Sequence, residues 1–109
     1  MAGEIAYEDF LKLELRVAKI EAAERILGTA KLIKLSIDLG TEKRQLVAGI
    51  ADTYTAENIV GKKIIVLTNL KPKVIKGLES KGMLLAADLE GKAVLLTTDM
   101  DVPVGSLIR

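Results

Sequence analysis

Short segments in which apolar and polar residues alternate constrain the fold of this chain more than any other feature. In the segment 32–39 every second residue from Ile33 onward is apolar, and polar residues stand between them. Because successive side chains of a strand point to opposite faces, this period of two predicts a strand with one buried face. The segment 15–24 alternates less regularly, and a turn at 40–43 joins 32–39 to a third strand at 45–50 as a hairpin.

The rest of the chain predicts two short helices, further strands and one long loop. An amphipathic turn of helix is expected over 7–13, and Thr55 is expected to cap a single helical turn over 56–60 that Gly61 ends. Further strands are expected over 62–70, 83–89 and 92–97, with a flexible basic loop over 71–82. Turns at this spacing indicate a barrel or a sandwich. Three strands, a short helix and more strands follow the order of an all-β, five-stranded OB-fold Greek-key barrel, although the pattern does not single out that topology.

Composition removes several classes of chemistry. The 109 residues fit one domain, and they include no cysteine and no histidine. A disulfide framework, a thiolate nucleophile, a Ser-His-Asp triad and a histidine-ligated metal are therefore excluded. The longest apolar stretches are too short to span a membrane, and the first residues do not resemble a signal peptide. We expect a cytoplasmic protein with no catalytic residues, no metal, no cofactor and no membrane partner.

Positive charge is concentrated in one segment. The formal net charge of the whole chain is only +1, yet residues 62–81 hold six lysines and a single acidic residue, Glu79. Such a segment is either a solvated lysine-rich hairpin or a positively charged surface that binds nucleic acid.

The stretch from Asn69 to Ala87, Asn-Leu-Lys-Pro-Lys-Val-Ile-Lys-Gly-Leu-Glu-Ser-Lys-Gly-Met-Leu-Leu-Ala-Ala, decides between these readings. It resembles the signature of the tRNA-binding OB domain, which occurs in methionyl-tRNA synthetases, as their free β-subunit and as stand-alone tRNA-binding proteins. Shorter matches support the resemblance, which covers roughly residues 7–109: Leu15–Val17, Ala30–Leu32, Val47–Ile50 and Tyr54–Lys63.

The resemblance implies a homodimer that binds tRNA by shape, with little sequence preference, and that assists a methionyl-tRNA synthetase or acts alone. Its partners would be tRNA, a second copy of itself and, as a further candidate, the synthetase catalytic subunit. The family's usual His-Pro-Asn-Ala-Asp-Lys run is here Ile26–Lys31 and keeps only the lysine. This connection therefore departs from the family pattern at every position except Lys31.

Eight residues are the candidate tRNA-binding site: Lys31, Asn69, Lys71, Lys73, Lys76, Ser80, Lys81 and Met83. The lysines can meet successive phosphates and release counterions. Asn69 either bonds a ribose or base or caps a turn, and Ser80 bonds either a phosphate or a backbone group. The thioether of Met83 either packs in the core or lies against an exposed base or ribose. Gly77 and Gly82 are expected to serve conformational needs alone.

The chain is expected to be one domain, with an OB core over about 14–98 and terminal extensions that form an isologous dimer contact. This expectation rests on the apolar excess and on apolar residues at both ends: Tyr7, Phe10, Leu11, Val102, Val104, Leu107 and Ile108. Two alternatives remain. The acid pairs Asp88/Glu90 and Asp99/Asp101 either hold a divalent cation or lie at the edges of solvated turns. The same fold also occurs in CsaA-like secretion chaperones, whose corresponding loop lacks the Gly-Met pair found here.

Overall fold

A computed structural model describes residues 2–109 of the chain. The main sheet has the spatial order β3-β2-β1-β4-β7, and β10 pairs with β1 beside it. These strands are β1 (Leu15–Arg25), β2 (Leu32–Asp38), β3 (Lys43–Gly49), β4 (Lys63–Leu67), β7 (Met83–Leu84) and β10 (Leu107–Ile108). Two further hairpins consist of β5 (Lys73–Ile75) with β6 (Leu78–Ser80) and of β8 (Ala86–Leu89) with β9 (Lys92–Leu95). The two helices are α1 (Tyr7–Phe10) and α2 (Ala56–Ile59).

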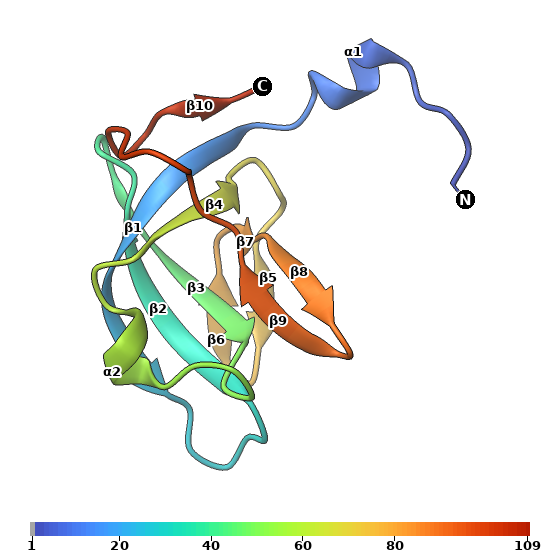
Figure 1. The fold of residues 1–109 in the computed structure, drawn as a ribbon. Helices are drawn as coiled ribbons and strands as arrows, with labels where there is room; N and C mark the ends of the chain where they lie inside the picture. The colour runs from blue at the N-terminus through green and yellow to red at the C-terminus, as the bar shows by residue number, and fades with distance from the viewer. Residues whose placement is uncertain (1) are drawn as a thin grey trace.

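The long strand β1 belongs to two walls of the molecule. Its first half pairs antiparallel with β4. From Lys19 onward it pairs antiparallel with β2, with a register shift between Ile20 and Ala22. A bulge of this kind bends a strand and increases its twist. The strands consequently curl into a nearly closed barrel, with both small hairpins on one side of it (Figure 1). This confirms the predicted all-β, OB-like barrel.

The interior of the barrel is filled by the alternating residues of the first three strands. Ile33, Leu35 and Ile37 of β2 are fully buried, as are Ile20 of β1 and Leu46 of β3. The period of two therefore predicted the buried face of β2 correctly.

A second, smaller apolar cluster lies on the outer side of the β1–β4 wall. It contains four buried residues of these strands: Leu15, Val17, Ile65 and Leu67. Phe10 from the N-terminal segment packs against it, together with Val102 and Ile108 from the C-terminal segment. The two ends of the chain thus cover their own barrel with part of their apolar surface, and both run along the same end of the molecule (Figure 1).

Helix α2 forms as predicted, one residue shorter. The side chain of Thr55 accepts a hydrogen bond from the Asn58 N–H at 3.2 Å, and the Asn58 side chain accepts one from the Thr55 N–H at 3.1 Å. This reciprocal capping box satisfies two N–H groups at the start of the helix. Ile59 is fully buried and holds the turn against the barrel.

The second half of the chain differs from the prediction in several places. The strand expected over 92–97 ends at Leu95, and β10 was not expected. The strand expected over 62–70 ends at Leu67. The Thr68 N–H still donates to the Glu14 C=O at 2.8 Å, and the chain bends at Asn69 and Leu70. The strand expected over 83–89 divides at Leu85, and only its first part pairs with β4. The segment expected to be a flexible loop contains the β5–β6 hairpin. Its strands are only three residues long, so the alternation was too brief to indicate them.

Candidate nucleic-acid interface

The basic segment forms a tight hairpin that places a lysine at its tip. Ile75 is opposite Leu78, so Lys76 and Gly77 are the two loop residues. Their φ angles of 51° and 78° are both positive, which is the geometry of the type I′ turn that matches the twist of paired strands. The side chain of Lys76 therefore leaves the outermost point of a paired structure.

Hydrogen bonds fix the base of this hairpin to the edge of β3. The Oγ of Ser80 accepts from the Val47 N–H at 3.0 Å and donates to the Gly82 C=O at 3.1 Å. Gln45 contributes two bonds: its Nε2 donates to the Glu79 C=O at 3.0 Å, and its own C=O accepts from the Lys81 N–H at 2.9 Å. The hairpin is thus anchored at its base, and its tip projects from the barrel.

Gly82 performs the conformational role predicted for it. Its φ is +125°, and a Cβ at this position would lie 2.9 Å from the backbone oxygen of Leu67. Only glycine allows this backbone conformation and this close approach without strain.

A groove of about 330 Å³ lies between the hairpin and β3. We call it the hairpin groove. Its walls are largely apolar and include Val47, Leu70 and Ile75, while Lys71 and Lys73 stand on its rim. Ser80 and Met83 also line it, and 47% of the Met83 surface is exposed. Four of the eight predicted site residues therefore meet around one cavity.

The lysines of the hairpin are free to meet an anion. Lys71, Lys73 and Lys76 are exposed and form no ion pair with any residue of the described chain. Lys81 is exposed at the hairpin base, where its Nζ lies 3.6 Å from a carboxylate oxygen of Glu79. Exposed pairs of this kind contribute little to stability, so Lys81 can exchange this partner for a phosphate.

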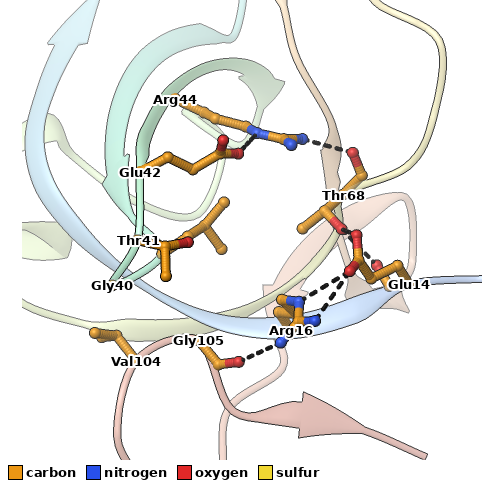
Figure 2. A pocket seen from close by; sticks show the side chains of 10 residues that line it. Glu14, Arg16, Gly40, Thr41, Glu42, Arg44, Thr68, Val104 and Gly105 are labelled. Atoms are coloured by element: carbon orange, nitrogen blue, oxygen red, sulfur yellow. Dashed lines mark hydrogen bonds and ion pairs between the residues drawn. The ribbon is translucent and has the colours of Figure 1, made fainter.

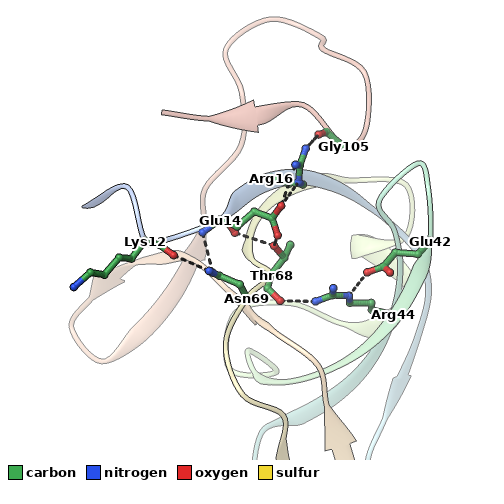
Figure 3. Close-up of polar contacts among 8 residues, drawn as sticks. All are labelled: Lys12, Glu14, Arg16, Glu42, Arg44, Thr68, Asn69 and Gly105. Carbon is green, nitrogen blue, oxygen red and sulfur yellow. Dashed lines mark hydrogen bonds and ion pairs between the residues drawn. The ribbon is translucent and has the colours of Figure 1, made fainter. Parts of the chain in front are cut away.

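Two predicted site residues lie outside both the hairpin with its base and the hairpin groove. Lys31 precedes β2, and the carbons of its side chain lie 3.4–3.7 Å from where a Cβ of Gly49 would be. Since Gly49 lines the groove, Lys31 borders its β3 side. The side chain of Asn69 instead ties down the N-terminal segment: its Oδ1 accepts from the Glu14 N–H at 2.8 Å, and its Nδ2 donates to the Lys12 C=O at 2.6 Å (Figure 3).

The structural roles of Ser80 and Asn69 were open alternatives at the sequence level. Both side chains form backbone hydrogen bonds in the folded chain. Their direct contact with tRNA stays a prediction.

A polar pocket of about 410 Å³ on another side of the barrel was not anticipated from the sequence. Figure 2 shows Arg16, Arg44 and Glu42 around it, together with Glu14 and Thr68. The Thr68 hydroxyl donates to Glu14 at 2.6 Å, Arg16 donates to the same carboxylate at 3.0–3.1 Å, and Arg44 donates to the Thr68 C=O at 2.5 Å.

These bonds join separate parts of the chain. The Thr68 hydroxyl and then the Arg16 guanidinium hold the pKa of Glu14 below its ordinary value of 4.5. Arg16 also donates to the Gly105 C=O at 2.8 Å, which connects the C-terminal segment to β1 (Figure 3). Because both arginines are paired with carboxylates, the pocket is a structural junction. Only the Glu14–Arg16 spacing hints at it in the sequence.

The acid pairs make contacts within the chain itself. No group of three potential ligands lies close enough to hold a metal ion in the part of the chain that the structure describes. Asp88 instead accepts a hydrogen bond from the Gly91 N–H at 2.8 Å within a turn, and Asp101 pairs with Lys63 at 2.6 Å.

Comparisons with known proteins place this geometry in context. The family described as "Putative tRNA binding domain" matches residues 15–107. The methionine–tRNA ligase of Archaeoglobus fulgidus is 50% identical over 105 residues, which are 96% of this chain and 16% of that protein. That of Thermotoga maritima is 50% identical over 104 residues, or 95% of this chain and 16% of that protein. The chain thus spans about a sixth of the length of these relatives.

Two solved structures are similar over their entire length. A MetRS related protein from Pyrococcus horikoshii superposes with a TM-score of 0.92 at 42% identity, covering 99% of this chain and 100% of that one. The chaperone CsaA from Bacillus anthracis superposes with a TM-score of 0.90 at 32% identity, covering 98% of this chain and 100% of that one.

Proposed function

The chain belongs to the tRNA-binding domain family, and on this premise we propose that it binds folded tRNA through the β5–β6 hairpin and the hairpin groove. The observation that carries the proposal is a set of exposed lysines that have no carboxylate partner among residues 2–109: Lys71, Lys73 and Lys76. They lie on or beside a hairpin that hydrogen bonds anchor to the barrel. Lys31 and Lys81 extend this positive surface. An anchored array of ammonium groups meets phosphates with little loss of conformational freedom.

The aromatic residues support recognition of a folded RNA rather than a single strand. Proteins that hold single strands stack successive bases on aromatic rings. Here Phe10 packs against the outer apolar cluster, and the hydroxyl of Tyr54 accepts from the Leu95 N–H at 3.0 Å while its ring packs against the core. Tyr7 stacks with Phe10 in the N-terminal segment, and neither ring lines the hairpin groove. Binding by backbone and shape is consistent with this distribution.

The biological setting belongs to the same proposal. Relatives at about 50% identity are methionine–tRNA ligases in which the matched region is a small part. We therefore propose that this domain raises the tRNA affinity of a methionyl-tRNA synthetase or acts as a stand-alone tRNA-binding protein, with no chemistry of its own.

A homodimer is the proposed assembly. Tyr7, Leu11 and Leu107 are 67%, 57% and 42% exposed, beside the segments that cover the outer apolar cluster. Burial of these side chains against a second copy would remove apolar surface from water. The OB core over about 14–98 would then form the tRNA-binding unit, and the terminal extensions would form the two-fold contact.

One second candidate has a specific observation in its favour. The chain is structurally similar to a CsaA chaperone, and the hairpin groove has apolar walls. Binding of unfolded polypeptide is therefore the alternative function.

Fluorescence anisotropy with labelled tRNA tests the proposal. Four to five neutralised phosphates predict that affinity falls on the order of 10²-fold between 50 and 200 mM salt. Several different tRNAs should compete similarly, and poly(U), duplex DNA and a permanently unfolded polypeptide should compete poorly. Equal competition by poly(U) would refute recognition of shape, and stronger competition by the polypeptide would favour the chaperone alternative.

A further inference from the structure

The edge of β3 leaves backbone hydrogen-bonding groups facing the hairpin groove. Strand β3 pairs with β2 alone in the main sheet, and the hairpin bonds to its other edge at Gln45 and Val47. Backbone groups of a strand alternate in direction, so the N–H and C=O of Gly49 point to the same side as the Val47 N–H. Gly49 is exposed and lines the groove, where it has no side chain to cover these groups.

The same groove combines apolar walls with a cationic rim. Leu70 and Met83 are 46% and 47% exposed there, although large apolar side chains are ordinarily buried. Lys71 and Lys73 are two residues apart, and both line the groove. A volume of about 330 Å³ is at the lower end of the ~300–1,000 Å³ typical of small-molecule pockets. The cavity is therefore of a size for one small planar group rather than for a helical segment.

We propose that the hairpin groove holds a single unpaired nucleobase that projects from the folded RNA. The base would lie between the apolar walls, with the Met83 sulfur against its face. Its hydrogen-bonding edge would meet the N–H and C=O of Gly49, and Lys71 and Lys73 would take the flanking phosphates. Charge complementarity favours a nucleotide over a peptide here, because each nucleotide carries an anionic phosphate beside its base, whereas a peptide need not. This inference rests on the proposed function and adds a base-binding subsite to it.

Titration of the isotope-labelled protein with small probes, followed by NMR, tests the subsite without tRNA. Nucleoside 5′-monophosphates should shift the backbone amide signals of Gly49 and Met83, whereas ribose 5-phosphate and inorganic phosphate should shift only signals near Lys71 and Lys73. Equal responses to nucleotides and to ribose 5-phosphate would overturn the proposal. A neutral apolar peptide that shifts the groove signals more strongly than the nucleotides would also overturn it.

Groove-filling variants connect the subsite to tRNA. Ala48→Leu and Ala93→Leu add volume to the groove lining, and Met83→Ser removes the apolar contact at a half-exposed position that does not support the core. Each should weaken tRNA binding by up to about tenfold, which is the upper end of the range for a contact between a methionine sulfur and an aromatic ring. The matched controls are Ala87→Leu and Met100→Ser, at exposed positions outside the groove. Both controls should bind as the unsubstituted protein does.

The outcomes separate the two proposals. If the groove variants, including the exposed Met83→Ser, keep full tRNA affinity, the base-binding subsite is refuted while tRNA binding stands. If the unsubstituted protein binds nucleotides in the groove but does not bind tRNA, the proposed function fails, and only nucleotide binding by the groove stands.

Discussion

Replacement of two hairpin lysines gives the sharpest test of the proposed tRNA interface. The double variant Lys71→Ala/Lys76→Ala removes two exposed ammonium groups that have no carboxylate partner in the described chain. Each phosphate contact contributes about 0.9 to the slope of log affinity against log salt, so the slope should become shallower by about 1.8. If the variant and the parent bind equally at 1 M salt, this change in slope predicts that the variant binds about 200-fold more weakly at 50 mM salt and about 20-fold more weakly at 200 mM.

The assay is anisotropy with labelled tRNA at four or more salt concentrations. Circular dichroism and sedimentation should show an unchanged fold and assembly, because both substituted side chains are exposed. The control is Lys62→Ala/Lys92→Ala, which makes the same change in net charge at exposed lysines outside the hairpin. If the control lowers affinity and slope as much as the hairpin variant does, the charge acts diffusely and the site assignment is wrong.

Three further predictions concern stability and assembly. Ser80→Ala leaves the N–H of Val47 without its partner, which should cost about 1–3 kcal/mol and lower Tm by roughly 4–8 °C for each kcal/mol; an unchanged Tm in calorimetry would contradict the anchoring role. Leu11→Glu places a charge on an exposed apolar residue of the N-terminal segment, so sedimentation should show a monomer while circular dichroism shows an unchanged fold, and a persistent dimer would exclude this segment from the contact. The lowered pKa of Glu14 means that its contribution to stability is present above the ordinary carboxyl pKa and is lost as pH falls through the lower folded value. Denaturation should therefore show Glu14→Gln less stable than the parent at pH 7 and nearly equal to it well below pH 4.5, and a difference that does not change with pH would refute the assignment.

The candidate site was predictable from the sequence as a segment, but not as a shape. The gathering of lysines between residues 62 and 81 and the match to a family signature located the basic region. The β5–β6 hairpin was not predicted because its strands are only three residues long, which is too short for an alternation of apolar and polar residues to be recognised. The left-handed turn at Lys76 was equally invisible, since a lysine at positive φ is uncommon and is imposed by the pairing around it.

The predicted dimer surface was divided by the fold in a way that composition could not foresee. Phe10, Val102 and Ile108 pack against the outer cluster of their own barrel, whereas Tyr7 and Leu11 remain exposed. Apolar residues at the chain ends have the same character in the sequence, and only their position relative to β1 and β4 separates the two groups.

The sequence by itself determined what depends on neighbouring residues. The period of two specified the buried face of β2, and Thr55 specified the N-cap of α2. These interactions join residues at most a few positions apart, and therefore the chain order alone records them.

Only the tertiary structure decided the roles that depend on distant partners. Asn69 bonds to Glu14 across 55 positions, and Ser80 bonds to Val47 across 33. The groove beside β3 exists because the main sheet ends at that strand while the hairpin attaches to only part of its edge. Hydrogen-bond partners and cavities of this kind arise from the path of the whole backbone, which no local pattern of residues encodes.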